Sequence, residues 1–123
     1  MNKHKLFLNG EWLDSAAGET FEDINPATLE PIGLFQKASI DDVNHAVDSA
    51  EDAFDSWRTT PPPQRAKILY RAARLLEERK EELARLMTIE NGKVLLEARG
   101  DVQEAIDMAY LPEGWMKANC RVS

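Results

Sequence analysis

The stretch from Ser39 to Trp57, SIDDVNHAVDSAEDAFDSW, marks the point at which the chain changes from strand-like to helix-like patterning. Apolar side chains recur there about every 3.6 residues, the spacing that places them on one face of an amphipathic helix. Ser39, followed three residues later by Asp42, resembles a capping box with a shorter acid, so we expect a helix to begin here. The expected stripe consists of Val43, Ala46, Val47, Ala50, Phe54 and Trp57.

Helical patterning continues downstream of this stretch. The three prolines at 61–63 should end the first helix, and Pro62 or Pro63 can open a second. The helical period then runs on through ERKEELARLM, where Glu81 and Arg85 are spaced to form an ion pair along one helix. Asn91-Gly92 predicts a helix end.

A fourth helix is expected between Lys93 and Tyr110, and Pro112 should break it, because proline lacks the N–H that a helix interior needs. The residues expected to be buried along this helix are Leu95, Ala98, Val102, Ile106 and Ala109.

The residues before Ser39 predict short strands. Asn9-Gly10, between two apolar segments, predicts a tight hairpin turn, because both residues tolerate positive φ angles. Two further extended runs, around Phe21 and around Leu34, flank a turn at residues 25–28. Leu29 follows that turn where glycine would be comfortable, so its Cβ is unfavourable if φ is positive. So few strands cannot cover this much apolar helix surface, which indicates a piece of something larger.

Composition excludes several classes of function. The 123 residues carry a formal net charge of −7, and no stretch supplies the basic face that a nucleic-acid-binding protein needs. No apolar run is long enough for a signal peptide or a membrane span, so we expect no membrane partner. One cysteine excludes an intrachain disulfide and fits a reducing compartment. We therefore expect a cytoplasmic protein.

The candidates for chemistry are few. The glycines are scattered and form no phosphate-binding loop. His45 falls on the polar side of the first helix, and we interpret it as a surface residue rather than a metal ligand. Cys120 is the only cysteine; its neighbours Lys117 and Arg121 are cationic, but charges near a chain end are well screened. No histidine lies near it in sequence, so we expect an inert thiol and keep a nucleophile as the alternative.

Three stretches together resemble the aldehyde dehydrogenase family. LFLNGEWLDSAAGETFEDINPATLEPIG is similar to the opening of these enzymes, and AVDSAEDAFDSWRTTPPPQRAKILYRAARLLEERKEELARLMTIENGK is similar to the helices that follow. EARGDVQEAIDMAY matches the next helix, so the resemblance covers Leu6 to Tyr110. It implies an α/β fold of which this chain is a part, with a β-hairpin and short strands followed by about four helices. Residues 1–110 would be the N-terminal part of the coenzyme-binding domain and residues 111–123 a divergent tail.

The resemblance implies that the parent enzyme oxidises an aldehyde to an acid with NAD or NADP. In that family a cysteine within G-Q-x-C attacks the aldehyde, a glutamate activates water, and an asparagine side chain and a backbone N–H hold the oxyanion. None of these motifs occurs here, and Cys120 does not follow Gly-Gln. We therefore expect no catalytic and no cofactor-binding residues in this chain, and poor binding of NAD or NADP.

One family site maps onto this sequence by the same resemblance. Many members hold a structural K⁺ or Na⁺ with two backbone carbonyls before the N-P-A-T turn and an aspartate in a later helix, and hard oxygen ligands suit such an ion. The matching positions are Asp23, Ile24 and Asp101. The alternative is that Asp101 only faces solvent.

The residues after Tyr110 depart from the family pattern, and a truncation or a change of reading frame near Leu111 would explain the departure. Exposed helical stripes would then favour self-association or association with full-length family subunits. Two alternatives remain: a standalone helical interaction module without enzymatic activity, and a small enzyme that uses Cys120.

Overall fold

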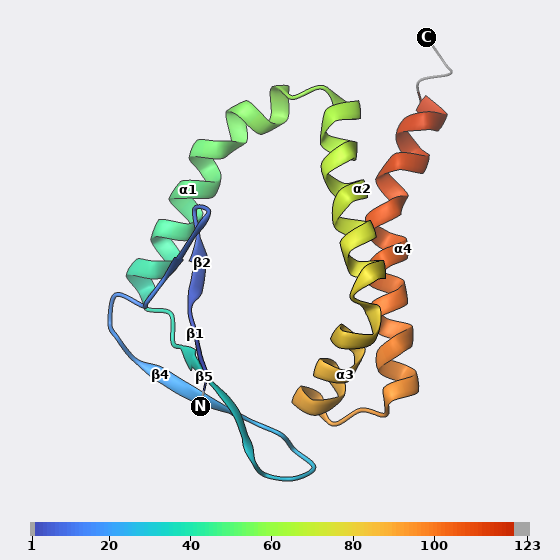
Figure 1. The fold of residues 1–123 in the computed structure, drawn as a ribbon. Coiled ribbons are helices and arrows are strands. Elements are labelled where there is room, and N and C mark those ends of the chain that lie inside the picture. The colour runs from blue at the N-terminus through green and yellow to red at the C-terminus, as the bar shows by residue number, and fades with distance from the viewer. Residues whose placement is uncertain (1, 120–123) are drawn as a thin grey trace. The chain divides into compact units, whose positions relative to one another are not determined.

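A computed structural model describes residues 2–119, with side chains described as far as Leu111, and Cys120 lies outside the described residues. The chain divides into two compact units, Met1–Thr59 and Thr60–Ser123 (Figure 1). The first holds the strands and α1, and the second holds α2, α3 and α4. The predicted order of short strands followed by four helices is confirmed. The bounds are β1 Lys3–His4, β2 Leu6–Leu8, β3 Glu11–Leu13, β4 Thr20–Ile24, β5 Pro31–Gln36, α1 Ile40–Thr59, α2 Pro62–Glu78, α3 Lys80–Asn91 and α4 Leu95–Asn119.

The strands of the first unit form two small sheets. One has the order β1-β5-β4, with β1 parallel and β4 antiparallel to β5, and the other is the β2-β3 hairpin. The sequence did not predict β1, because two residues are too few to show alternation. The ring of His4 stacks on Phe35 at 4.5 Å between centroids and lies over Gly33, where an added Cβ would come within 3.0 Å of that ring.

Both predicted turns of the first unit are confirmed. Asn9 and Gly10 have φ angles of 49° and 81°, and the turn places Phe7 and Trp12 opposite each other on the two strands. In the second turn the side-chain oxygen of Asn25 accepts a hydrogen bond from the Ala27 amide at 2.9 Å. Leu29 has a φ of 61°, so the unfavourable left-handed conformation expected for its side chain is present.

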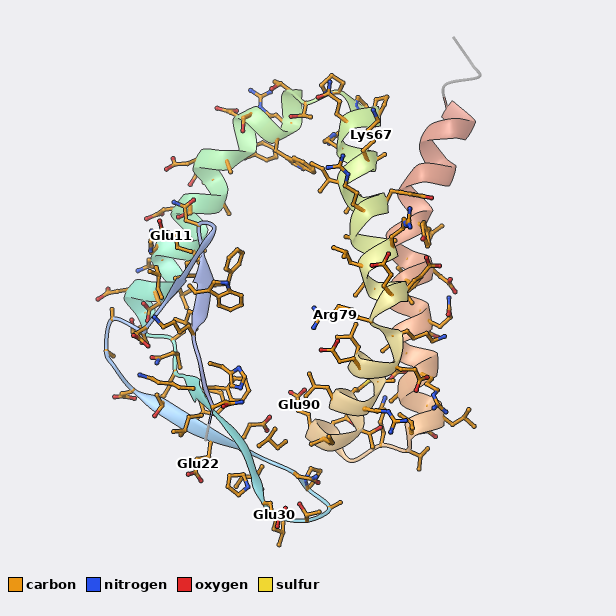
Figure 2. The ribbon with its side chains drawn as sticks, viewed as in Figure 1. Glu11, Glu22, Glu30, Lys67, Arg79 and Glu90 are labelled. Carbon is orange, nitrogen blue, oxygen red and sulfur yellow. The ribbon has the colours of Figure 1, made fainter. Side chains whose placement is uncertain are left out.

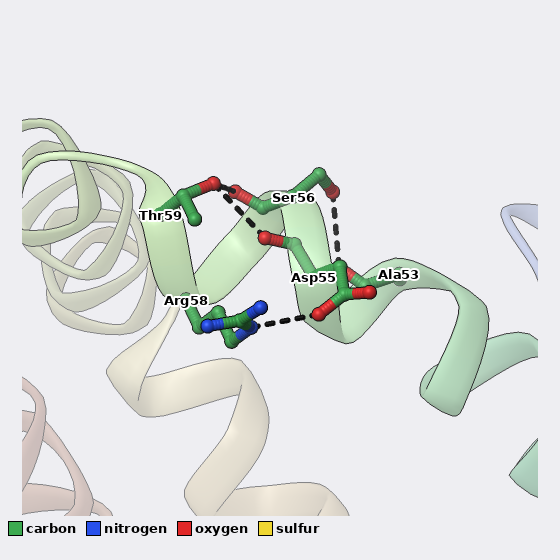
Figure 3. A network of polar contacts seen from close by, with 5 residues as sticks. All are labelled: Ala53, Asp55, Ser56, Arg58 and Thr59. Atoms are coloured by element: carbon green, nitrogen blue, oxygen red, sulfur yellow. Dashed lines mark hydrogen bonds and ion pairs between the residues drawn. The ribbon is translucent and has the colours of Figure 1, made fainter.

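Side-chain hydrogen bonds organise the C-terminal end of α1 (Figure 3). The Thr59 hydroxyl donates to the carbonyl oxygens of Asp55 at 2.9 Å and Ser56 at 3.1 Å. The Ser56 hydroxyl donates to the Ala53 carbonyl, and Arg58 Nε donates to the Asp55 carboxylate at 2.7 Å. The carbonyls of the last turn of a helix lack helical N–H partners, and the Thr59 hydroxyl bonds to two carbonyls of this turn.

The apolar stripe of α1 is present but largely uncovered. Val43, Val47 and Phe54 retain 53%, 59% and 58% of their accessible surface. These residues share one helical face, as the spacing predicted, and the strands of the first unit do not bury them. The exposure expected for a piece of a larger fold is therefore found on this helix.

The second unit has an apolar core along α4. Ala98, Val102 and Ile106 are at most 4% exposed, and Ala84 of α3 is fully buried against them. α4 packs against both α2 and α3. Three of the five residues predicted to be buried along α4, Ala98, Val102 and Ile106, form this core, and Leu95 is partly buried against it. Pro62 and Pro63 occupy the first turn of α2, as predicted.

The boundary between α2 and α3 lies at a single residue that the sequence pattern did not locate. Arg79, with φ −104° and ψ 11°, separates them, although no glycine or proline lies there. Glu81 also pairs with Arg99 of α4 rather than with Arg85, because the Arg99 guanidinium donates two hydrogen bonds, at 2.7 and 2.9 Å. The Glu81–Arg99 contact joins α3 to α4 and is not visible in local spacing. The helix end at Asn91-Gly92 is confirmed, with Gly92 at φ 78°.

The predicted break at Pro112 is also wrong, since α4 continues to Asn119. Proline inside a helix removes the hydrogen bond to the carbonyl four residues earlier and crowds it, at about 3 kcal/mol. Continuing α4 past Pro112 therefore loses one backbone hydrogen bond, but the residues that follow can still be helical. The prediction treated this cost as prohibitive.

Candidate functional site

The two predicted carbonyl ligands lie at the end of β4 in the first unit. Asp23 is half-buried opposite Gly33, and the register shifts between Asp23 and Ile24, which lies opposite Pro31. β4 is an edge strand of its sheet, so alternate carbonyls along it point away from the strand partner. The backbone at this edge can therefore offer oxygen ligands to an ion.

The third predicted ligand, Asp101, lies on α4 in the second unit. Lys93 Nζ donates a hydrogen bond to Asp101 Oδ2, and this bond raises the pKa of the Lys93 ammonium. The Asp101 side chain is 43% exposed. Asp101 is therefore partly exposed but not solvated on all sides, because the Lys93 ammonium already binds one of its carboxylate oxygens. A further cation would have to use Oδ1 or displace Lys93.

A polar cluster that sequence reasoning did not assemble surrounds Asp42. Its carboxylate accepts hydrogen bonds from the Ser15 hydroxyl at 2.7 Å, from the Ala16 amide at 3.1 Å and from the Ser39 amide at 2.8 Å. The Asp42 amide in turn donates to the Ser39 hydroxyl at 3.2 Å, so the predicted capping box is confirmed. We call Ser15, Ala16, Ser39 and Asp42 the Asp42 clasp.

Charge-assisted hydrogen bonds set the properties of the clasp. The bond from the Ser39 amide, followed by those from Ser15 and Ala16, holds the pKa of the Asp42 carboxyl well below its ordinary value. Asp42 is 9% exposed, so nearly all its acceptor capacity is used internally. Such a carboxylate stays charged and is a poor general base, and we interpret it as a structural group. The 27 residues between Ser15 and Asp42 explain why local spacing did not reveal the clasp.

Gln36 of β5 extends the clasp. Its side-chain oxygen accepts from the Ser15 amide at 2.9 Å, and its amide nitrogen donates to Asp14 at 2.8 Å. Gln36 is 5% exposed. Hydrogen bonds therefore connect residues 14–16, the loop after β3, both to Gln36 of β5 and to Asp42 at the start of α1.

A second polar group joins α2 and α4. The Tyr110 hydroxyl donates to Glu77 Oε2 at 2.7 Å, and the Tyr110 ring meets Tyr70 edge-on at 5.4 Å. The hydrogen bond to Glu77, helped by desolvation, raises the pKa of Tyr110 to about 12. The phenol is therefore protonated at neutral pH, and it joins the helices rather than acting as a base.

The other titratable side chains are dispersed. His45 is exposed on α1, as predicted. Glu11, Glu22 and Glu30 extend away from the strands of the first unit (Figure 2). Within the part of the chain that the structure describes, no three His, Cys, Asp or Glu side chains gather to hold a metal ion. Among the same residues, no helix is both long enough and apolar enough to cross a membrane.

Comparison with known proteins identifies the protein family that this chain resembles. The model of the "Aldehyde dehydrogenase family" matches residues 12–119. The chain is 39% identical over 113 residues to D-glyceraldehyde dehydrogenase (NADP(+)) of Thermoplasma acidophilum, covering 92% of this chain and 23% of that protein. It is 44% identical over 110 residues to malonate-semialdehyde dehydrogenase 2 of Oceanobacillus iheyensis, covering 89% of this chain and 23% of the relative.

Solved structures agree with the sequence comparison. The NAD-dependent aldehyde dehydrogenase from Sinorhizobium meliloti superposes with a TM-score of 0.88 at 31% identity, covering 95% of this chain and 24% of that one. An NADP-dependent enzyme from E. coli gives 0.85 at 37% identity, covering 89% of this chain and 23% of that one. The chain thus spans less than a quarter of the length of these relatives and matches their N-terminal part. It belongs to the aldehyde dehydrogenase family.

Proposed function

We propose that this chain supplies the N-terminal part of the coenzyme-binding domain of an aldehyde dehydrogenase and is not catalytic by itself. We assign residues 1–110 to that part and residues 111–123 to a divergent tail, of which the family match still includes residues 111–119. The observation that carries the proposal is a family match over residues 12–119 in a chain that spans 23% of its relatives. The parent reaction is the oxidation of an aldehyde to a carboxylic acid with NAD or NADP.

The side chains present support the absence of catalysis. The sequence contains one cysteine, Cys120, which does not follow Gly-Gln, and it contains no glycine-rich phosphate loop. Among the described carboxylates, Asp42 accepts the hydrogen bonds of the clasp, and Asp101 accepts a hydrogen bond from Lys93. We therefore expect NAD and NADP to bind weakly, which calorimetric titration with each dinucleotide would measure.

The exposed apolar face of α1 supports a role as part of a larger assembly. Val43, Val47 and Phe54 are more than half exposed and share one side of the helix. Covering these side chains would add about 25 cal/mol for each Å² removed from water. The partner that we propose is the remainder of an aldehyde dehydrogenase subunit, or another copy of this chain when the remainder is lacking.

Co-expression tests this function directly. This chain would be produced with the part of the Oceanobacillus iheyensis relative that follows the matched segment. We expect the two to co-purify and to form reduced nicotinamide from malonate semialdehyde, and we expect neither to do so alone. The variant Val47→Asp, which places a charge on the exposed apolar face of α1, should abolish co-purification, and Glu51→Gln, at an exposed polar position of the same helix, should not.

An activity assay of the chain alone distinguishes this proposal from the alternative that the chain is a small enzyme using Cys120. If the chain alone reduces NAD or NADP with a panel of aldehydes, and Cys120→Ser abolishes that turnover, the proposal is wrong and Cys120 is a nucleophile. We expect Cys120→Ser to have no effect, either alone or in the co-expressed complex.

One observation favours the second candidate, a standalone interaction module. The second unit has its own buried core of Ala84, Ala98, Val102 and Ile106. A module that works alone should unfold in one cooperative thermal transition without a partner. A part of a larger enzyme should instead gain a sharp transition only on co-expression with the remainder.

The predicted K⁺ or Na⁺ site at Asp23, Ile24 and Asp101 stays a prediction, supported by the edge position of β4 and opposed by the Lys93 pair at Asp101. Exchanging K⁺ for tetramethylammonium at constant ionic strength should lower the thermal stability of the co-expressed complex, and Asp101→Asn should remove that response. We also place the protein in the cytoplasm, consistent with its single cysteine. Fractionation of cells that produce it would test this.

A further inference from the structure

The dipeptide Asn-Gly occurs twice in this chain, at Asn9-Gly10 and at Asn91-Gly92. Asparagine before glycine is open to an intramolecular reaction, in which the glycine backbone nitrogen attacks the side-chain carbonyl carbon. Glycine favours this step because it has no Cβ to hinder the approach. Asparagine is accordingly counted among the thermolabile residues. The two copies share the reactive dipeptide, and both are exposed, so we look for a difference in reactivity in the hydrogen bonds and backbone around each.

Asn91-Gly92 is held at the end of α3. The Gly92 amide donates to the Thr88 carbonyl at 3.0 Å, which closes the helix. The Asn91 side-chain oxygen accepts from the Lys93 amide at 3.1 Å. The attacking nitrogen and the attacked amide group are therefore both engaged. This end of α3 must open before the two can react.

Asn9-Gly10 has neither restraint. Within residues 2–119 the Gly10 amide makes no hydrogen bond, and a Cβ built on Gly10 would meet nothing within 4 Å. The turn joins two three-residue strands that form a sheet of their own, and isolated hairpins are marginally stable. Asn9 has a φ of 49°, a left-handed conformation that asparagine tolerates.

We propose that Asn9 is a site of spontaneous deamidation and that the fold protects Asn91. A bond forms between the Gly10 nitrogen and Asn9 Cγ, the bond from Cγ to the amide nitrogen breaks, and ammonia leaves with the proton of the Gly10 amide. Water then opens the cyclic imide to aspartate or isoaspartate. Each product adds one negative charge beside Glu11, and isoaspartate adds a backbone carbon to a turn that has room for two residues.

This modification would loosen the hairpin. The register Leu8↔Glu11 depends on a two-residue turn, and the Phe7 and Trp12 rings, 4.9 Å apart, depend on that register. Isoaspartate at position 9 should therefore separate these rings. Trp12 lies away from the other two tryptophans in sequence, and replacing Trp57 and Trp115 with Phe isolates its fluorescence.

The test is incubation of the intact chain at mildly alkaline pH, followed by proteolysis and mass spectrometry of the peptides that contain each site. We expect Asn9 to deamidate at least about tenfold faster than Asn91, because helix opening must precede reaction at Asn91. In denaturant the two rates should become similar. Asn9→Gln should abolish most ammonia release from the native chain, and Asn91→Gln should leave it nearly unchanged.

The outcomes separate clearly. Equal native rates, or a faster rate at Asn91, would overturn the proposal. So would a native Asn9 that reacts no faster than Asn91 but accelerates in denaturant, because the hairpin would then protect the turn. A large native difference that disappears in denaturant supports it, and a shift in Trp12 fluorescence in step with isoaspartate formation supports its structural consequence.

Discussion

The two compact units use different forces to hold their elements together. In the first unit a buried carboxylate, Asp42, gathers hydrogen bonds from Ser15, Ala16 and Ser39, while the apolar face of α1 stays exposed. In the second unit α4 buries an apolar row against α2 and α3. The hydrogen bonds of the Asp42 clasp fix the orientation of the loop relative to α1, but they remove little apolar surface from water. Both units leave large apolar side chains exposed, but only the second has an apolar core of its own.

Removing the second unit's core should have the largest effect. Ile106 is 1% exposed, and Ile106→Ala should lower the free energy of unfolding by about 2–5 kcal/mol through lost burial and a residual cavity. Urea unfolding followed by helical circular dichroism measures this change. Met108→Ala, at an exposed position of the same helix, should stay within about 0.5 kcal/mol of the parent chain. A small effect at Ile106 would show that α4 is not packed as described.

Removing the clasp should have an intermediate effect, confined to the first unit. Ser39→Ala deletes the hydroxyl that caps α1 and should cost about 1 kcal/mol. Asp42→Asn should destabilise the first unit further, because it removes the charge that four donor groups face. Amide NMR shifts of residues 14–18 and 39–43 should move, and those of α4 should not. Changes spread equally over both units would contradict this independence.

The two units should respond to opposite extremes of pH. The clasp keeps the pKa of Asp42 below its unfolded value of about 3.9, so its stabilisation is present above that pH and is lost as pH falls through the folded pKa. Asp42→Asn should therefore flatten the acid-induced loss of structure in the first unit. The measurement is an acid titration followed by NMR. An unchanged acid profile would show that Asp42 is not the responsible group.

In the second unit the sign is reversed. Tyr110 has its pKa raised to about 12 by Glu77, so the stabilisation is complete below the unfolded pKa of about 10 and is lost as pH rises through about 12. Tyr110→Phe should flatten the alkaline decline of the second unit in circular dichroism. The hydrogen bond to Asp101 also raises the pKa of Lys93, so Lys93→Met serves as the comparison.

The exposed ion pair between Glu81 and Arg99 should matter least. Both side chains are well solvated, with 57% and 40% of their surfaces exposed, so solvent screens the pair. Arg99→Gln should leave the thermal midpoint within experimental error at physiological salt and lower it slightly at low salt. A large effect at high salt would mean that the pair is more important to α3–α4 packing than its exposure indicates.

Local signals predicted most of the elements. Asn9-Gly10, the Ser39–Asp42 cap, the prolines before α2 and the α4 stripe each act through neighbouring residues, and each is confirmed. The features missed depend on distant partners. Ser15 donates a hydrogen bond to Asp42, and Lys93 donates one to Asp101. Arg99 of α4 donates to Glu81 of α3. A single sequence does not show which distant side chains meet, so the family resemblance supplied the candidate ligands, while only the structure revealed the lysine beside Asp101.

Hydrogen exchange of this chain, alone and with the remainder of a relative, distinguishes part of a larger fold from an independent module. If the chain is the N-terminal part of an aldehyde dehydrogenase, the amides of α4 around Val102 and Ile106 should be protected even in the isolated chain. The amides of α1 should exchange rapidly when the chain is alone and become protected in the complex. Strong protection of α1 in the isolated chain, unchanged by the remainder, would contradict the account.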